Sequence, residues 1–349
     1  MTAANTDASL VLGIESSCDE TAAAVVRGGR EVLSNVIASQ HELHARFRGV
    51  VPEIASRSHV VRILPILRQA LAEARLQPRD LDAVAVTHRP GMIGCLLVGL
   101  AAAKALCWRF RLPLVGVDHV QAHIHAAFMT SPESPLPLLA LVASGGHTAM
   151  YRVDGPGHAE RLGATRDDAA GEALDKAAAL LGLPYPGGPS IQAAAHGGDP
   201  ASVAFPRALL APDSLDFSFS GLKTALLVHL QKRGLDQGRT LDPVTLADVA
   251  AAYQAAVVDT LVAKLARAAR SCGARSLAIG GGVARNERLR AEIQSHRDLA
   301  ELAVVLPPPD LCSDNAAMVA GLGAHLWAHG APSQLDLEAM ATTRSSRAP

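Results

Sequence analysis

The sequence predicts an α/β protein made of two similar lobes. Apolar stretches of strand length alternate with longer helical stretches, and the strand pattern that opens the chain returns near its middle. A length of 349 residues is enough for two domains of ordinary size. Apolar residues make up 49% of the chain and charged residues 19%, which indicates a soluble protein with a substantial core.

The first half predicts an antiparallel meander followed by alternating helices and strands. Strands are expected at 9–16, 22–26 and 31–38, with a turn at 18–21 and a tight turn at 27–30. A helix at 52–76 follows, in which Pro65 predicts a kink or a break. A strand at 81–87, a helix at 91–110 and a strand at 114–117 complete this half. The order is therefore β-β-β-α-β-α-β.

The second half begins like the first. After a proline-rich link at 131–137, strands are expected at 136–143 and 148–153 around a Ser-Gly-Gly-His turn. A long alanine-rich helix at 246–272, a strand at 276–279 and a glycine-rich turn come later. We therefore expect an N-terminal lobe of residues 1–130 with about 315–335, a C-terminal lobe of residues 131–314, and a flexible tail at 336–349.

Cysteine usage, apolar runs and net charge indicate the cellular compartment of the protein. The five cysteines are scattered without a C-x-x-C pair, which favours reduced thiols. The start of the chain lacks the pattern of a signal peptide, and the longest apolar run, 92–103, is too short to span a bilayer. We therefore expect a cytoplasmic protein with no membrane association. A net charge of −1 gives no general attraction to nucleic acid, although it leaves room for local patches of positive charge that bind it.

The stretch VDHVQAHIHAAF, residues 117–128, is a candidate metal site. His119 and His123 are four residues apart, so on a helix both imidazoles lie on one face and can reach one ion. A zincin helix reads H-E-x-x-H, whereas Val120 occupies the position of the general base here. A metalloprotease is therefore disfavoured, and a third ligand is needed from elsewhere in the chain.

Asp314 is the candidate for that third ligand. It lies in LCSDNAAM, after three prolines and at the start of a predicted helix. A lone aspartate at such a place is often a helix cap, and Ser313 or Asp314 is the natural N-cap here. Together with the two histidines, Asp314 would complete a His-His-Asp set with open coordination positions, as catalytic metals require.

Three turns have the residue types of phosphate-binding loops. They are the acidic turn at 15–21, the paired-glycine turn at 142–148 and the triple-glycine turn at 278–286 before a helix. None is a Walker A or a Rossmann motif, and a plain hairpin also uses glycines. Two hairpin turns, one per half, and a later glycine-rich strand-to-helix turn are typical of the duplicated α/β fold of actin, Hsp70 and hexokinase (the ASKHA fold), in which two lobes enclose a nucleotide. We therefore predict that fold, with an interlobe nucleotide and metal site.

Longer strings resemble one known family. They are GIESSCDET (13–21), RGVVPEIASRSH (48–59), VDHVQAH (117–123), SGGHT (144–148), DDAAGEALDKAAALLGLPYPGGP (167–189), DFSFSGLKT (216–224), GGGVARN (280–286) and CSDNAAM (312–318). From about residue 10 to about residue 323 the chain is similar to the TsaD-type tRNA N6-adenosine threonylcarbamoyltransferases, once described as O-sialoglycoprotein endopeptidases. One departure is that the family's T-A-G-P-G-L is Thr87-His88-Arg89-Pro90-Gly91-Met92 here.

The resemblance implies an activity and its ligands. The activity is transfer of threonylcarbamoyl from threonylcarbamoyl-AMP to N6 of adenosine 37 in tRNAs that read ANN codons. His119, His123 and Asp314 would hold one divalent metal, with Fe²⁺ expected and Zn²⁺ as the alternative; Mg²⁺ could accompany a nucleotide such as ATP. The residues expected to bind the adenylate are Val142, Ala143, Ser144, Gly145, Gly146, Asp175, Gly188 and Asn286. The implied partners are tRNA, a TsaB-like paralogue and a TsaE-like ATPase.

The proton acceptor for the adenine amine stays open at this point, with Glu15, Asp19 and His147 as candidates that could equally be structural. Two other classes of function also stay open. An ATP-dependent small-molecule kinase of the same fold would share the phosphate turns but would not need the His-His-Asp set. A non-catalytic ATP-binding scaffold would need neither the metal nor the base.

Overall fold

The computed structural model describes residues 8–47, 49–208, 211, 213–234 and 241–342. The chain forms two compact units, residues 1–132 with 313–349 and residues 133–312. The sequence-based division placed Asp314 at the end of the second lobe. In the structure, the chain from Ser313 onward belongs to the first unit, together with both histidines of the candidate metal site.

The first unit contains a five-stranded mixed sheet. Its strands are β1 (Leu10–Glu15), β2 (Glu20–Arg27), β3 (Glu31–Ser39), β4 (Ala83–Arg89) and β5 (Leu114–Asp118), in the order β3-β2-β1-β4-β5. The β1–β2 and β2–β3 pairs are antiparallel, and the β1–β4 and β4–β5 pairs are parallel. The predicted opening meander is confirmed, and β1, β4 and β5 end at the same edge of the sheet.

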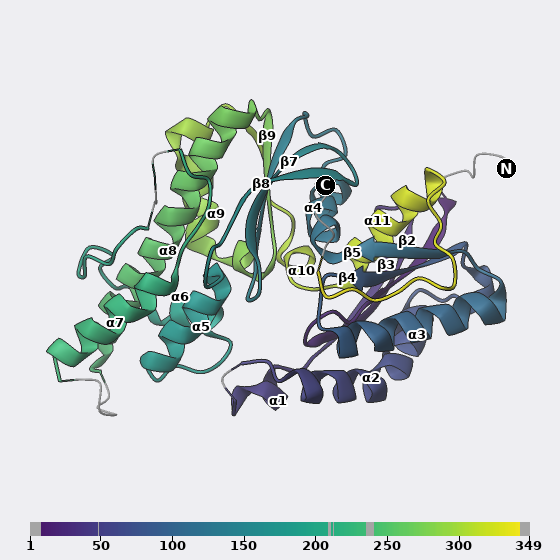
Figure 1. The fold of residues 1–349 in the computed structure, drawn as a ribbon, viewed down its shortest axis with the longest axis horizontal. Coiled ribbons are helices and arrows are strands. Elements are labelled where there is room, and N and C mark those ends of the chain that lie inside the picture. Colours follow the sequence, from purple (N-terminus) through teal and green to yellow (C-terminus); the bar gives the residue numbers. More distant parts are fainter. Residues whose placement is uncertain (1–7, 48, 209–210, 212, 235–240, 343–349) are drawn as a thin grey trace, which may run out of the picture. The chain divides into compact units, whose positions relative to one another are not determined.

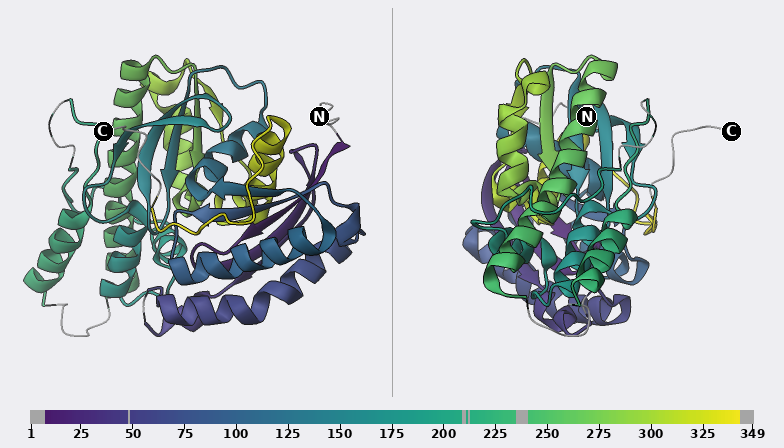
Figure 2. Two further views of the ribbon diagram at one scale, coloured as in Figure 1. Left: turned by 45° about the vertical axis from the view of Figure 1, so that its right-hand side comes forward. Right: turned by 90° about the vertical axis from the view of Figure 1, so that its left-hand side faces the viewer.

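Helices cover both faces of this sheet. Helices α2 (Pro52–Glu73) and α3 (Ile93–Phe110) run side by side across one face, and α11 (Ala316–Ala328) lies on the other (Figure 1, Figure 2). The short α1 (His41–Ala45) precedes α2, α4 (His119–Thr130) follows β5, and a 3₁₀ turn spans Pro78–Asp80. The prediction of a break at Pro65 is wrong, because α2 continues through it. Pro65 is exposed, so the carbonyl that lacks a partner can bond to water.

The second unit repeats the plan of the first sheet. Its strands are β6 (Leu138–Ala143), β7 (Thr148–Gly155), β8 (His158–Ala164), β9 (Ser276–Gly280) and β10 (Ala303–Val305), in the order β10-β9-β6-β7-β8. Here too the first three strands form antiparallel pairs, while β9 and β10 add in parallel. Read from its third strand, each sheet has the same connectivity, which confirms the predicted duplication.

The core of the second unit forms around one long helix. The helices are α5 (Ala170–Leu180), α6 (Gly187–Ala194), α7 (Ser220–Lys232), α8 (Pro243–Cys272), α9 (Glu287–Ser295) and α10 (Pro309–Cys312), with 3₁₀ turns at Gly282–Arg285 and Arg297–Leu299. Among the described residues, α3 and α8 have the length and apolar composition of a membrane span. Core helices of soluble proteins share this length and composition, and most of α8 is buried inside the protein.

The segment after α11 is held against the first unit. Ser333 bridges to Leu114 of β5 and its hydroxyl accepts a hydrogen bond from the Gly116 amide. Further along, His88 Nδ1 lies 3.0 Å from the Glu338 carbonyl oxygen, and the Met340 amide donates to the His88 carbonyl. Within the predicted flexible tail, 336–342 therefore contact the first unit through Glu338 and Met340, and 343–349 lie outside the described residues. These contacts also give a packing partner within this chain to the buried His88 of β4, one of the two residues that depart from the family pattern.

Candidate metal and adenylate site

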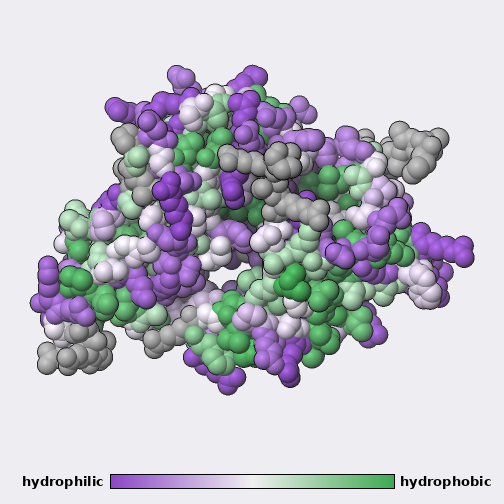
Figure 3. Space-filling view, in the orientation of Figure 1, coloured by the Kyte–Doolittle hydropathy of each residue, from purple (hydrophilic) through white to green (hydrophobic). Residues whose placement is uncertain are grey.

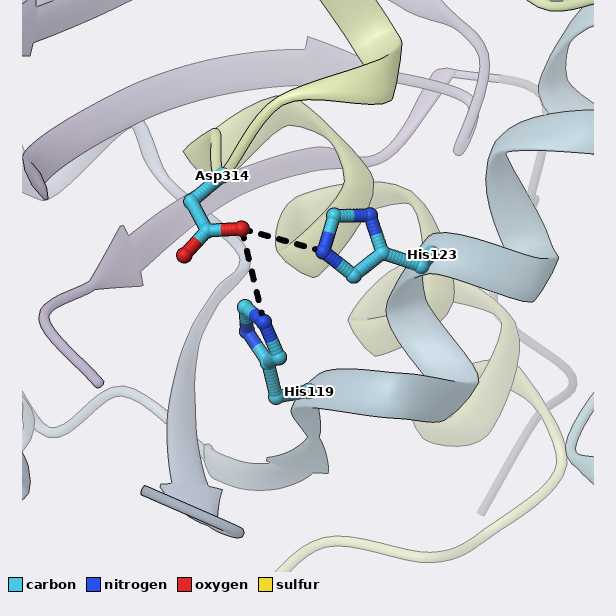
Figure 4. Close-up of side chains that lie close together, drawn as sticks. All are labelled: His119, His123 and Asp314. Carbon is cyan, nitrogen blue, oxygen red and sulfur yellow. Dashed lines mark hydrogen bonds and ion pairs between the residues drawn. The ribbon is translucent and has the colours of Figure 1, made fainter. Parts of the chain in front are cut away.

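Two histidines and one aspartate of the first unit meet at one point (Figure 4). Oδ1 of Asp314 lies 3.1 Å from Nε2 of His123 and 3.5 Å from Nε2 of His119. The imidazole rings are 4.7 Å apart and nearly perpendicular. All three side chains are largely buried. The sequence-based expectation that these groups lie together agrees with this geometry.

Local sequence explains why the histidines point the same way. Strand β5 ends at Asp118, and its carboxylate accepts hydrogen bonds from the amides of Val120 and Gln121, so α4 begins at once with His119. Arg89, one of the two residues that depart from the family pattern, places its Nε 3.2 Å from the other oxygen of Asp118. His123 follows one helical turn later on the same face.

Asp314 is free to face the histidines because its neighbour caps the next helix. Asn315, and neither Ser313 nor Asp314, is the N-cap of α11, with its side-chain oxygen accepting from the Met318 amide. The predicted capping role of Ser313 or Asp314 is therefore wrong. The loop before α11 instead presents the Asp314 carboxylate to α4.

A buried carboxylate contacts the ring nitrogen of His119 that faces away from Asp314. Glu15, the last residue of β1, places Oε2 3.0 Å from His119 Nδ1 and accepts a hydrogen bond of 2.6 Å from the Thr87 hydroxyl. Its other oxygen accepts from the Ser17 amide at 2.6 Å. A hydrogen bond from Nδ1–H to Glu15 would leave Nε2 as the ring nitrogen that faces Asp314 and that is available to a metal ion. Neither Ser17 nor Thr87 was predicted as a partner of Glu15; Ser17 lies in a string that carries the family resemblance, and Thr87 begins the segment that departs from the family pattern.

The charges of this cluster are strongly coupled. Burial opposes the charged imidazole of His119, yet the carboxylates of Asp314 and Glu15 overcome it and raise the pKa of His119 well above its usual value. Burial also opposes the charged form of Asp314, but His119 and His123 hold the pKa of that carboxyl well below its usual range. For His123, burial prevails and lowers the pKa. The cluster therefore stabilises positive charge between the two carboxylates.

These residues fit a divalent transition metal. One ligand atom from each of His119, His123 and Asp314 lies within 4.8 Å of the others. Two imidazole nitrogens with one carboxylate oxygen suit iron or zinc and leave coordination positions for a substrate. The His119–Glu15 pair supplies the outer carboxylate that metal-bound histidines commonly have.

Two of the three predicted turns meet in the second unit. In the turn between β6 and β7, the Ser144 amide donates to the His147 carbonyl and the His147 amide donates to the Ser144 hydroxyl. Gly281, at φ +84°, lies against the backbone of Ala143, so a side chain there would collide with β6. A Cβ added at Gly145 or Gly146 would meet no atom of the described residues within 4 Å. The chain itself therefore leaves room for a ligand to approach this backbone.

The other candidate adenylate residues differ in what their side chains contact. Val142 and Ala143 are buried in the core, so only their backbone can face a ligand. The Asp175 carboxylate accepts a hydrogen bond from the Gly187 amide at 2.6 Å, which places it beside Gly188. Asn286 precedes the first turn of α9 as its N-cap, where its side chain bonds to the Leu289 amide and to Gln254. The Asn286 side chain is thus held by the protein.

The three candidates for the proton acceptor lie in different places. Glu15 and Asp19 belong to the first unit and His147 to the second. Glu15 is fully buried with both oxygens hydrogen-bonded, whereas His147 is exposed. Asp19 is buried and forms a separate cluster with Glu20 and His41.

A duplicated pair of sheets with a glycine-lined turn after β6 defines the class of actin-like, nucleotide-binding ATPase folds. Solved structures of that class match almost the whole chain. Full-length HypF in its phosphate- and nucleotide-bound form matches with a TM-score of 0.58 and 12% identity, over 93% of this chain and 47% of HypF. Component A of the (R)-2-hydroxyglutaryl-CoA dehydratase of Acidaminococcus fermentans matches with a TM-score of 0.56 and 14% identity, over 92% and 100%. At these identities the matches establish the fold alone.

The chain belongs to the family of tRNA N6-adenosine threonylcarbamoyltransferases. The family model, TsaD, matches residues 31–321. A relative of that name from Anaeromyxobacter dehalogenans (strain 2CP-C) is 52% identical over 330 residues, covering 94% of this chain and 97% of the relative. Another, from Symbiobacterium thermophilum, is 51% identical and covers 95% of each. The protein is thus a tRNA-modifying transferase, as the sequence motifs predicted.

Proposed function

We propose that this chain transfers the threonylcarbamoyl group of threonylcarbamoyl-AMP to N6 of adenosine 37 in tRNAs that read ANN codons. The products are N6-threonylcarbamoyladenosine (t6A) and AMP, and the setting is the cytoplasm. The observation that carries the proposal is the convergence of His119, His123 and Asp314 on one point, with Glu15 behind them. A kinase of the same fold or an ATP-binding scaffold would have no use for this buried ligand set.

In this proposal His119, His123 and Asp314 hold one divalent metal, Fe²⁺ with Zn²⁺ as the alternative. A bound ion would orient the threonyl carboxylate or hydroxyl and polarise the carbamoyl carbonyl. Glu15 holds His119 in its ligating tautomer. Because both Glu15 oxygens already accept hydrogen bonds, we assign it an orienting role in preference to that of general base.

The second unit binds the adenylate in this proposal. The backbone of 142–146 faces the phosphate, Asp175 accepts from ribose hydroxyls, and Gly188 and Asn286 line the rest, with Mg²⁺ accompanying ATP where ATP binds. The reaction forms the bond from N6 to the carbamoyl carbon and breaks the bond from that carbon to the phosphate oxygen. One proton leaves N6, and backbone amides stabilise the charge that develops on the departing AMP. Holding both reactants in line supplies much of the rate.

A reconstituted reaction tests this function. The purified chain is combined with its partner proteins, unmodified tRNA and threonylcarbamoyl-AMP, and t6A is measured by mass spectrometry of the hydrolysed tRNA. The proposal requires t6A at position 37 and one AMP for each modified nucleoside. Absence of t6A, with ATP-dependent phosphorylation of a small molecule instead, would establish the kinase alternative.

Gly145→Ala is expected to impair adenylate binding while leaving the fold intact. Within the part of the chain that the structure describes, the added methyl meets no atom within 4 Å, and the backbone is outside the left-handed region, so Tm should not change. A phosphate close to the backbone would collide with it, and we expect KM for the adenylate to rise about tenfold, or ~1.4 kcal/mol. Gly155→Ala, equally open, is the matched control. Equal KM values for the two variants would show that the phosphate of the adenylate does not bind at this turn.

An uncovered apolar surface in the first unit supports the proposed protein partner. Helix α2 buries one face, yet Val60, Val61 and Leu64 of α2 are more than half exposed, and Ile93 and Leu97 of the neighbouring α3 are also exposed. Figure 3 shows apolar side chains gathered over α2 and α3. Contiguous apolar surface of this kind marks protein interfaces. We propose that the TsaB-like paralogue docks on this α2–α3 surface, and that the TsaE-like ATPase joins the resulting complex.

Leu64→Asp is expected to weaken that complex. Leu64 is 57% exposed, so its replacement should leave Tm of the isolated chain nearly unchanged. A charge in the centre of an apolar interface should lower affinity for the paralogue about thirtyfold, or ~2 kcal/mol, measurable by calorimetry. Val244→Asp, at an exposed apolar position of the second unit, is the control. Unaltered affinity in Leu64→Asp would mean that the paralogue binds elsewhere.

A further inference from the structure

A second group of metal-ligating side chains lies in the first unit, separate from the His119 site. It comprises Asp19 in the turn after β1, Glu20 at the start of β2 and His41 at the start of α1. Their ligand atoms all lie within 4.8 Å of one another. Nε2 of His41 is 3.2 Å from Glu20 Oε1 and 3.8 Å from Asp19 Oδ2.

The hairpin geometry brings these three residues together. Glu20 pairs with Ser39 in the antiparallel β2–β3 ladder, so the end of β3 returns the chain beside the start of β2. The Gln40 amide then donates to the Asp19 carbonyl, and His41 follows immediately. The cluster is therefore fixed by backbone pairing on both sides, which is the rigidity that a metal site needs.

Asp19 has a buried carboxylate oxygen that accepts no hydrogen bond from the described residues. Its side chain is only 9% exposed, yet among the described residues no hydrogen-bond donor reaches Oδ2. A buried carboxylate oxygen without a partner is costly unless a positive charge satisfies it. Glu20 is nearly as enclosed, since its side chain is 13% exposed. Burial and the neighbouring Asp19 charge prevail over the His41 hydrogen bond and raise the pKa of Glu20 to about 8.

We propose that Asp19, Glu20 and His41 form a second divalent-cation site. Two carboxylates with one imidazole favour Mn²⁺, Fe²⁺ or Zn²⁺ over Mg²⁺ and Ca²⁺, which prefer sites built of oxygen ligands alone. His41 is 42% exposed, so an ion has access from its side and keeps positions for water. An ion here neutralises the two acids and ties α1 to the start of β2. This inference does not depend on the reaction that the enzyme catalyses.

The main competing explanation is an ion pair between a protonated His41 and the two acids. Substituting His41 separates the two explanations. His41→Ala removes a ligand and also removes the ion pair. His41→Asp destroys the ion pair by adding a third negative charge, but it supplies a carboxylate ligand and so keeps a cation site.

The test counts Mn²⁺ ions bound to the metal-stripped full-length chain, by electron paramagnetic resonance of the ions left free. We expect two ions on the wild-type chain and one on His41→Ala, with the second restored in His41→Asp. Asp314→Ala should lose the ion of the His119 site and keep the ion that depends on His41. Because His41→Asp keeps a cation site, added Mn²⁺ should raise the Tm of that variant. His158→Ala, at an exposed histidine of the second unit, should bind two. One ion on the wild-type chain, or at least two on His41→Ala with affinities within a factor of about ten of wild type, would overturn the proposal.

Discussion

Asp314→Ala is expected to abolish formation of t6A while the chain remains folded. Oδ1 of Asp314 is the point that both imidazoles approach, so its loss leaves two neutral ligands and no charge to hold a divalent ion. Metal affinity should fall at least about a hundredfold, or ~3 kcal/mol. Metal content by mass spectrometry and t6A yield in the reconstituted reaction measure the two effects. His119→Ala should behave in the same way.

Asp310→Ala provides the matched control for this prediction. Asp310 lies four residues earlier in the chain and is exposed, so its removal should change neither metal content nor t6A yield. Thermal unfolding of both variants shows whether Asp314→Ala remains folded. A normal t6A yield from an Asp314→Ala chain that has lost the ion of this site would refute the proposed site and would favour the scaffold alternative.

The duplication was predictable from sequence because buried strands have a strong local signature. Strands β1 and β6 consist almost entirely of apolar residues and are followed by polar turns, so both halves could be recognised. Edge strand β8 was missed because most of its side chains are exposed or half-buried, which leaves no apolar alternation to detect. The three residues of β10 are too few for any pattern. Helix α2 passes through Pro65 because the helix packs onto the sheet, and packing overrides local propensity.

The convergence of His119, His123 and Asp314 could be predicted, but its surroundings could not. Helical spacing relates His119 to His123 within one turn, which a sequence displays directly. The Glu15–His119 contact joins residues 104 positions apart, and it exists because β1, β4 and β5 end at one edge of the sheet. That edge is where ligand-binding residues of α/β sheets collect. Asn315 caps α11, while the Asp314 carboxylate faces the buried histidines, a tertiary contact that the local sequence does not display.

Glu15→Gln is expected to reduce metal affinity without removing a metal ligand. The glutamine keeps the shape of Glu15, but it loses the negative charge that fixes the His119 proton on Nδ1 and makes Nε2 a better donor to a metal. Loss of such an outer carboxylate costs about ten- to a hundredfold in metal affinity, or ~1.4 to 3 kcal/mol. Metal titration of the variant measures this loss directly.

The same variant separates orientation by Glu15 from general-base catalysis. If Glu15 only orients His119, saturating the variant with metal should restore most of kcat, because the ligand set itself is complete. If Glu15 accepts the proton from N6, kcat should stay low at any metal concentration and the pH dependence of kcat should lose its acidic limb. Glu53→Gln, at an exposed site of α2, should match wild type in both measurements. Since Ser17, Thr87 and His119 already occupy the Glu15 oxygens, we expect recovery with metal.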